Sequence, residues 1–220
     1  MKKYSTVLFD FDGTIAHSEI PLIHTIRETL NHHGYEYEKY KHTLTNRSGR
    51  PIIDVYDELF GSDKAKLMRE THKKMQRNHL HKYSLLDGAL ETLKTLKKND
   101  VSTAIVTSAN KEKIDALVDI LHIAEYFDYT ISLEDVSEAK PNPEGIQRAM
   151  TELRAEPQLT VMVGDSPNDI KAANQAGIDS IFITTNIAKL HDLISTYTID
   201  EFDQILPIVG LGQPHYEHNI

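Results

Sequence analysis

Residues 6–14 read TVLFDFDGT, an apolar run that ends in two closely spaced aspartates. Four later apolar runs are similar in length and rich in β-branched residues: 103–106, 129–132, 160–163 and 180–183. Short, nearly uninterrupted apolar runs of this kind are typical of parallel strands that are buried on both faces of a sheet. We therefore expect residues 6–9 to form a strand inside such a sheet.

Segments with helical periodicity alternate with these apolar runs. They lie at 89–98, 111–121, 145–153 and 168–176, with apolar residues three and four positions apart. This alternation predicts an α/β fold: an open, mostly parallel, Rossmann-like sheet flanked by helices and joined by right-handed crossovers. Ligands of such sheets bind beyond the carboxyl ends of the strands. The polar residues that follow each run are therefore the candidates for a ligand site.

One stretch breaks the alternation, because residues 19–82 show helical patterns and no convincing strand. Gly34 and Gly61 follow two of these patterns at positions where helix ends often require a positive φ. A helical insert directly after the first strand is typical of a cap domain. We predict an α/β core of residues 1–16 and 84–209, an α-helical cap of residues 17–83, and a loosely held C-terminal tail of residues 210–220.

The composition limits the classes of partner. The 220 residues are 40% hydrophobic and carry a formal net charge of −9, which argues against nucleic acid or an anionic membrane as the main partner. The chain has no cysteine, so disulfides and thiolate chemistry are excluded. The first apolar run is too short for a signal sequence or a membrane span, so we expect a cytoplasmic protein.

Asp10 and Asp12 follow the first run with a single residue between them. Two carboxylates at this spacing point to the same side of an extended chain, and a divalent cation would neutralise their repulsion. Mg²⁺ prefers such oxygen ligands. Gly13 would supply the turn by which the chain leaves the sheet. The alternative at this point is an ordinary loop in which Asp12 forms an Asx-turn.

Two further strand ends offer groups that bind anions. Thr107 and Ser108 follow the second run, where a hydroxyl and backbone N–H groups near a helix start could hold a phosphate. Simple helix capping is the alternative for this pair. Lys140 stands in a proline-stiffened loop after the third run, where an ammonium could neutralise a carboxylate and phosphoryl oxygens. A solvated surface lysine is the alternative.

Asp165 and Asp169 follow the fourth run. Ser166, Pro167 and Asp169 have the order of an N-cap, a first-turn proline and an N3 acid, so Asp169 has a structural explanation. Asp165 precedes the cap, at the strand end where a metal ligand is expected. Successive strand ends with carboxylates, a hydroxyl, a lysine and further carboxylates favour a metal-assisted phosphoryl-transfer site.

These segments resemble the motifs of the haloacid dehalogenase-like superfamily. The matching residues are Asp10-Phe11-Asp12-Gly13-Thr14, Thr107, Lys140-Pro141 and Gly164-Asp165-Ser166 through Asp169. The order of the motifs spans nearly the whole chain, and the helical insert resembles the cap of the phosphoglycolate phosphatase and β-phosphoglucomutase group. The resemblance implies a core sheet with strand order 3-2-1-4-5, which places Asp10 on the central strand.

The resemblance also implies roles for the matching residues. Asp10 would attack phosphorus and bind Mg²⁺. Asp12 would protonate the leaving group, then take a proton from the water that hydrolyses the aspartyl-phosphate, and its backbone carbonyl would bind the metal. The other implied roles are phosphate binding by Thr107 and the Ser108 N–H, charge neutralisation by Lys140, metal ligation by Asp165, and orientation of metal-bound water or Lys140 by Asp169.

The second aspartate of the first motif limits the reactions that the resemblance allows. Dehalogenases of the family lack it, so Asp12 favours a Mg²⁺-dependent phosphatase, a phosphoric monoester hydrolase. A phosphomutase of the β-phosphoglucomutase type is the closer alternative. Such enzymes carry a cap histidine about a dozen residues after the nucleophile, where this chain has Leu22, with His17 and His24 displaced from that place. A binding module that lost turnover is a further alternative, although the catalytic carboxylates and lysine are all present.

The predicted cap offers one candidate for substrate specificity. Arg47 and Arg50 flank a glycine at the start of a cap helix, and either could bind a carboxylate or a second phosphate. Two solvated arginines are the equal alternative. We expect a small phosphorylated substrate, such as phosphoglycolate, pyrophosphate or a sugar phosphate, and a monomer or homodimer with no nucleic-acid or membrane partner.

Overall fold

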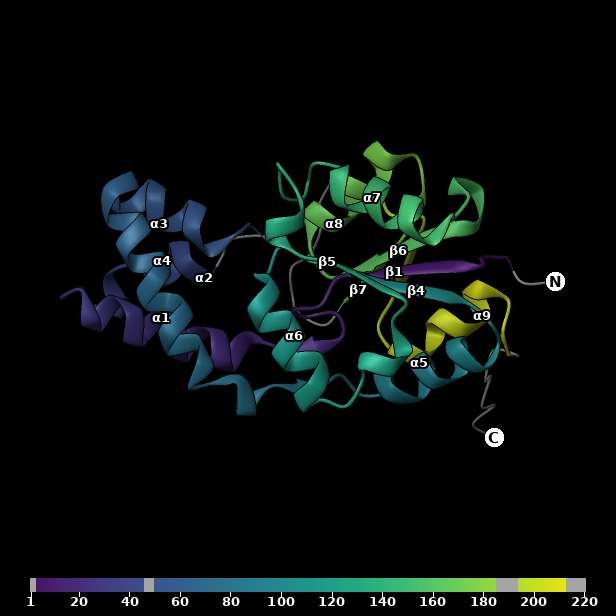
Figure 1. Ribbon diagram of the computed structural model, residues 1–220, viewed down its shortest axis with the longest axis horizontal. Helices are drawn as coiled ribbons and strands as arrows, with labels where there is room; N and C mark the ends of the chain where they lie inside the picture. The colour runs from purple at the N-terminus through teal and green to yellow at the C-terminus, as the bar shows by residue number, and fades with distance from the viewer. Residues whose placement is uncertain (1–2, 46–49, 185–193, 213–220) are drawn as a thin grey trace, which may run out of the picture.

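The computed structural model describes residues 3–45, 50–184 and 194–212. Six parallel strands form one sheet in the order β5-β4-β1-β6-β7-β8 (Figure 1). Their bounds are β1 Thr6–Phe9, β4 Ser102–Val106, β5 Tyr129–Ile131, β6 Thr160–Gly164, β7 Asp179–Ile183 and β8 Tyr197–Ile199. The first five strands have the predicted 3-2-1-4-5 order, with β1 in their centre. The sequence analysis missed β8, which pairs with β7 at the edge.

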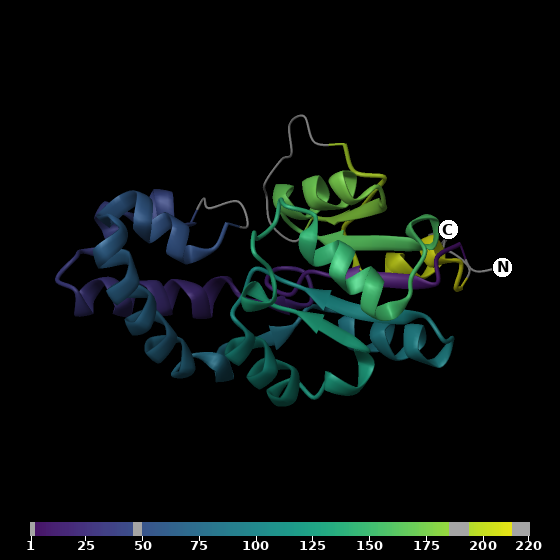
Figure 2. The ribbon, with the colours of Figure 1, turned by 45° about the horizontal axis from the view of Figure 1, so that its top comes forward.

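Helices cover both faces of the sheet, which explains the uninterrupted apolar runs. Figures 1 and 2 show α7 and α8 on one face, with α5, α6 and α9 on the other. In β1, Val7 and Phe9 pack into the core beneath α5, α6 and α9, whereas Leu8 packs beneath α7 and α8. The helices are α5 Ala89–Lys98, α6 Lys111–Ile120, α7 Glu144–Leu153, α8 Pro167–Ala176 and α9 Ile205–Val209.

Residues 19–77 supply four helices beside the sheet, at the left of Figure 2. They are α1 Glu19–His32, α2 Lys41–Thr45, α3 Ile52–Phe60 and α4 Ser62–Arg77. Their apolar faces form a core of their own, in which Leu30, Tyr56 and Met68 are fully buried. The antiparallel pair β2 (Ala16–His17) and β3 (Ser84–Leu85) joins this helical segment to the sheet. We keep the division into core and cap domains as a proposal.

Local signals explain where several elements start and stop. Ser166 caps α8 in a reciprocal capping box with Asp169, and Pro167 is in the first turn, as the sequence predicts. Gly61 ends α3 with a φ of 80°. Gly210 ends α9, and residues 213–220 of the predicted tail lie outside the described residues. Short 3-10 helices occupy Tyr37–Lys39, Leu80–Lys82, Ala124–Tyr126, Leu133–Asp135, Pro157–Leu159 and Phe202–Gln204.

Within the described ranges, none of the helices has the length and the apolar character that a membrane crossing requires.

Candidate active site

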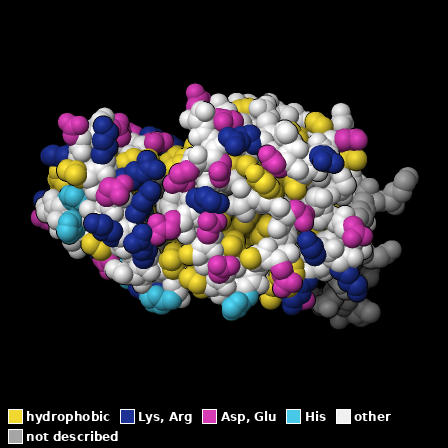
Figure 3. All heavy atoms as spheres, in the orientation of Figure 1, with side chains coloured by type: hydrophobic (Ala, Val, Ile, Leu, Met, Phe, Trp, Pro, Cys, Tyr) yellow, Lys and Arg dark blue, Asp and Glu magenta, His cyan; other side chains and the backbone are white. Residues whose placement is uncertain are grey.

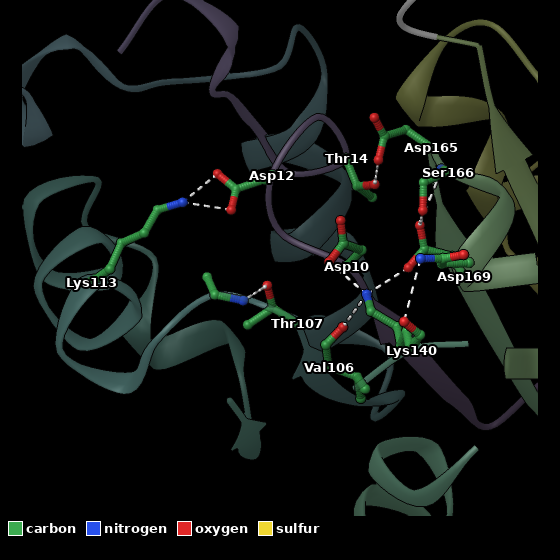
Figure 4. A network of polar contacts seen from close by, with 12 residues as sticks. Asp10, Asp12, Thr14, Val106, Thr107, Lys113, Lys140, Asp165, Ser166 and Asp169 are labelled. Atoms are coloured by element: carbon green, nitrogen blue, oxygen red, sulfur yellow. Dashed lines mark hydrogen bonds and ion pairs between the residues drawn. The ribbon is translucent and has the colours of Figure 1, made fainter. Parts of the chain in front are cut away.

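The carboxyl ends of β1, β4 and β6 open into one cleft of about 1310 Å³, which also contacts the helical segment. The strand order brings these ends together, because β1 lies between β4 and β6. The cleft collects these sequence-predicted residues: Asp10, Asp12, Thr107, Ser108, Lys140, Asp165 and Asp169. Figure 4 shows the side chains of most of them in one network, drawn from segments far apart in the chain.

Lys140 is the centre of this network. Its Nζ donates to Oδ1 of Asp10 at 2.7 Å, to Oδ1 of Asp169 at 2.5 Å and to the carbonyl of Val106 at 2.8 Å (Figure 4). The residue is 8% exposed, so it is not the solvated lysine of the alternative interpretation. Burial alone would lower the pKa of Lys140, but Asp10 and Asp169 outweigh it and raise the pKa. Lys140 is therefore a fixed cation beside Asp10.

Asp10 directly follows the apolar strand β1 and lines the cleft. It is 7% exposed, and burial raises the pKa of its carboxyl to about 6, an effect that Lys140 opposes and Asp169 reinforces. Burial, followed by repulsion from Asp10, raises the pKa of Asp165 as well. Two buried carboxylates and the half-buried Asp165 thus lie close to one lysine, and further positive charge would stabilise their ionised forms.

The donor set fits a bound divalent cation. Asp10, Asp165 and Asp169 each place a ligand oxygen within 4.8 Å of the others. Carboxylate oxygens are the ligands that Mg²⁺ prefers. Both oxygens of Asp169 already accept hydrogen bonds, from Lys140 and from the backbone and hydroxyl of Ser166. Asp10 and Asp165 are therefore the better candidates for direct ligands, and Asp169 for an orienting group.

The turn after β1 brings the two motifs into contact. Gly13 has a φ of 85°, and a Cβ atom at this position would overlap the carboxylate of Asp165. Only glycine satisfies both conditions without displacement of the Asp165 side chain. Thr14, which the sequence analysis did not single out beyond the motif, is fully buried and donates to Oδ1 of Asp165 at 3.3 Å. The pair Gly13-Thr14 thus positions a candidate metal ligand.

Thr107 and Ser108 line the cleft beyond the end of β4. The Thr107 hydroxyl accepts the N–H of Ala109 at 3.1 Å, which leaves its own hydrogen to donate. The buried hydroxyl of Ser108 has no hydrogen-bond partner among the described residues. Asn110, and not Ser108, caps α6, because its side chain accepts the N–H of Lys113. The Thr107 hydroxyl is therefore available to an anion in the cleft, whereas the enclosed Ser108 hydroxyl would become available on rotation of its side chain.

Asp12 differs from the other acids of the site. Both of its carboxylate oxygens accept from Nζ of Lys113, at 2.6 and 2.5 Å, and Figure 4 shows it turned away from Lys140. The sequence analysis missed Lys113. The sequence does give a sign that Lys113 is unusual. It lies in the apolar stripe of α6, next to Ile114 and four residues before Leu117, where a lysine is rare.

The predicted specificity loop is only partly described. Arg47 lies outside the described residues. Arg50 is exposed and pairs with Glu58 at 3.1 Å, and it is not among the described residues that line the cleft. Other cations line it instead, from the helical segment and from α6: Lys41, Arg69, Lys73, Lys82 and Lys113.

Comparisons with known proteins agree with this geometry. The chain is 29% identical over 214 residues to the pyrophosphatase PpaX of Bacillus mycoides strain KBAB4, covering 94% of this chain and 98% of the relative. It resembles the solved structure of a haloacid dehalogenase-like protein from Bacteroides fragilis, with a TM-score of 0.83, 27% identity, and coverage of 92% and 100%. CbbY from Rhodobacter sphaeroides, solved with phosphate, shares the fold at a TM-score of 0.81, 22% identity, and coverage of 96% and 100%.

Residues 7–183 match the family described as haloacid dehalogenase-like hydrolase. This range runs from the strand that carries Asp10 to the end of β7, so it includes every strand end of the cleft. The chain belongs to the haloacid dehalogenase-like hydrolase family.

Proposed function

We propose that this chain is a Mg²⁺-dependent phosphatase that forms an aspartyl-phosphate on Asp10 and hydrolyses a small phosphorylated metabolite. The observation that supports it best is the contact of buried Lys140 with both Asp10 and Asp169, beside the half-buried Asp165. A carboxylate is a weak nucleophile toward an anionic phosphate ester unless nearby positive charge offsets the repulsion. This arrangement supplies such charge at the carboxylate.

The chain belongs to a hydrolase family, and relatives named pyrophosphatase support a phosphatase activity. Cytoplasmic location and a monomeric or homodimeric state are our further expectations.

The contacts of Asp10 indicate which oxygen would react. Its Oδ1 accepts from Lys140, so Oδ2 is the oxygen left to attack phosphorus. As the Oδ2–P bond forms, the bond between phosphorus and the leaving oxygen breaks, and Asp12 gives that oxygen a proton. Asp12 then takes a proton from the water that attacks the aspartyl-phosphate. Release of phosphate restores the carboxylate of Asp10.

Other residues of the cleft would hold the transferred group. Lys140, the Thr107 hydroxyl and the Ser108 N–H would bind its oxygens, with the Ser108 hydroxyl as a further donor. Mg²⁺, held by Asp10, Asp165 and the backbone carbonyl of Asp12, would supply positive charge beside the phosphoryl group. The helical segment would exclude water from the cleft. Asp169, bound to Lys140 and Ser166, would keep the lysine in place.

The substrate carries, in this proposal, a second anionic group. Lys41, Arg69 and Lys73 line the side of the cleft formed by the helical segment, and Figure 3 shows Lys and Arg side chains gathered over that part of the molecule. Glu134 lies 3.8 Å from Arg69 and 3.7 Å from Lys73, so a second anionic group of the substrate would compete with this glutamate for the two cations. Pyrophosphate is the first candidate because relatives carry that activity in their names. Phosphoglycolate-like compounds and sugar phosphates follow.

A phosphate-release screen tests the proposal. Pyrophosphate, phosphoglycolate and several sugar phosphates are incubated with wild type, with Asp10→Asn, and with Asp115→Asn as a control at an exposed aspartate of α6. Wild type and the control should release phosphate from a few substrates with Mg²⁺ and none with EDTA. Asp10→Asn should release essentially none. Equal turnover by Asp10→Asn would refute the nucleophile, and rearranged product without phosphate would identify a mutase.

A further inference from the structure

The ion pair between Asp12 and Lys113 joins two segments that the motifs do not connect. Asp12 follows β1, and Lys113 lies in the first turn of α6, yet both oxygens of the carboxylate lie within 2.6 Å of the ammonium. The Lys113 side chain is only 5% exposed, and its Nζ also lies 5.1 Å from the centre of the Tyr83 ring. A buried lysine with these two partners is held in place by its surroundings.

The pair also decides where the carboxylate of Asp12 lies. Asp10, Asp165 and Asp169 gather around one point, but Asp12 is not part of that group, and Figure 4 shows it directed to the opposite side. Its charge still disfavours the ionised forms of Asp10 and Asp165. Lys113 therefore keeps a fourth carboxylate out of a space already crowded with negative charge.

We propose that Lys113 is a positioning residue for the acid/base group of this enzyme. In the substrate-free protein it holds the Asp12 carboxylate at the wall of the cleft, from where the side chain rotates toward the leaving oxygen once substrate is bound. Without Lys113, Asp12 loses its one ion pair among the described residues, and repulsion from Asp10 spreads it over unproductive positions. The inference rests on the acid/base role proposed for Asp12.

The proton balance stays that of the proposed reaction. Asp12, ionised beside Lys113, takes up one proton from solvent as it leaves the lysine and gives it to the leaving oxygen in the first displacement. It takes a second proton from the attacking water in the second displacement and releases it to solvent when it returns to Lys113. Lys113 keeps all of its protons and forms no covalent bond. Lys113 acts on the position of the Asp12 carboxylate before the reaction. Loss of Lys113 should therefore lower kcat, and only in an enzyme that still has Asp12.

A direct role in substrate binding is the competing explanation, because Lys113 lines the cleft beside other cations. The two explanations predict different kinetics. A residue that binds substrate raises KM whether or not Asp12 is intact, whereas a residue that acts through Asp12 has no effect once Asp12 is lost.

The experiment is a double-mutant cycle with Asp12→Asn, Lys113→Met and the combined variant, using p-nitrophenyl phosphate and pyrophosphate with Mg²⁺. We expect Lys113→Met to lower kcat about tenfold or more, in the range that misplaced catalytic groups produce, with less than about a threefold change in KM. In the Asp12→Asn background the same substitution should change kcat less than about twofold.

Matched variants separate this effect from a folding defect. Lys111→Met removes an exposed lysine of the same helix, which pairs with Asp115, and should leave kcat unchanged. Lys113→Arg keeps the charge and should recover part of the activity, whereas Lys113→Gln should not. Thermal unfolding of the metal-free proteins gives a readout that is independent of turnover: Asp12→Asn and Lys113→Met should be non-additive, since both break the same pair.

Three outcomes would overturn the inference: multiplicative effects on kcat, a rise in KM alone, or a Lys113→Met enzyme faster than wild type. Failure of the proposed function looks different, because wild type itself would then release no phosphate, or Asp10→Asn would release as much. If Lys113→Met does not fold, Lys113→Gln and Lys113→Arg carry the same comparison.

Discussion

Nζ of Lys140 lies 2.7 Å from Oδ1 of Asp10, and this one contact connects two motifs that are 130 residues apart. The same nitrogen contacts Asp169 and the end of β4, so a single ammonium connects three strand ends. Loss of this cation would leave Asp10 and Asp169 without their shared partner. Stability and chemistry therefore depend on the same side chain.

Lys140→Met should abolish phosphatase activity and destabilise the metal-free protein. The substitution keeps the length of the side chain but leaves buried carboxylates without a counter-charge, which typically costs about 3–5 kcal/mol. Urea unfolding in EDTA measures the loss. Lys171→Met, at an exposed site on α8, is the control and should be neutral. A stable, active Lys140→Met enzyme would contradict the role of the lysine.

The raised pKa of Asp10 predicts how pH affects the metal-free protein. Because burial raises this pKa from 3.8 to about 6, the folded state favours the protonated carboxyl. Its contribution to stability is complete below about pH 3.8 and is lost as the pH rises through about 6. In EDTA, the unfolding free energy of wild type should therefore fall relative to that of Asp10→Asn between about pH 4 and 7.

Mg²⁺ should oppose the loss of stability at higher pH, because it binds the ionised carboxylate of Asp10. Its apparent affinity should fall as the pH drops below about 6, by about tenfold per unit for each proton displaced. Isothermal titration calorimetry in two buffers of different ionisation enthalpy measures both the affinity and the protons released. An affinity that does not change between about pH 5 and 7 would argue against Asp10 as a ligand.

Gly13→Ala should damage the site more than an equivalent change elsewhere. Gly13 and Gly34 both have a positive φ, 85° and 76°, so alanine at either position costs on the order of 1–2 kcal/mol of stability. A Cβ atom at Gly13 also meets Asp165, whereas one at Gly34 meets nothing within 4 Å. Both variants should lose similar stability from strain, and only Gly13→Ala should lose Mg²⁺ affinity and turnover. Equal metal binding by the two variants would contradict the positioning of Asp165 by this turn.

The sequence predicts much of the site because strand ends are a strong signal. Asp10 and Thr107 directly follow apolar runs, and Asp165 follows its run after one glycine. Parallel pairing then brings their side chains to one edge of the sheet. Lys113 could not be predicted as a site residue, because a lysine in a helix is usually solvated. The burial of Lys113 depends on the carboxylate of Asp12, about 100 positions away in the chain. Likewise β8 is only three residues long and lies at the edge, where its pairing with β7 defines it.

Ser108→Ala should separate stability from binding. The buried hydroxyl of Ser108 has no partner among the described residues, so the free protein carries the cost of an unsatisfied polar group, typically about 1–3 kcal/mol. Removing it should leave the free protein as stable or more stable, and should raise KM or the dissociation constant of inorganic phosphate.

Thr92→Val is the matched control. The Thr92 hydroxyl on α5 is also buried without a partner among the described residues, but Thr92 is not among the residues that line the cleft. It should raise stability without changing KM. If Ser108→Ala leaves phosphate binding unchanged, the Ser108 hydroxyl takes no part in holding the phosphoryl group, and Thr107 with the backbone N–H groups must suffice.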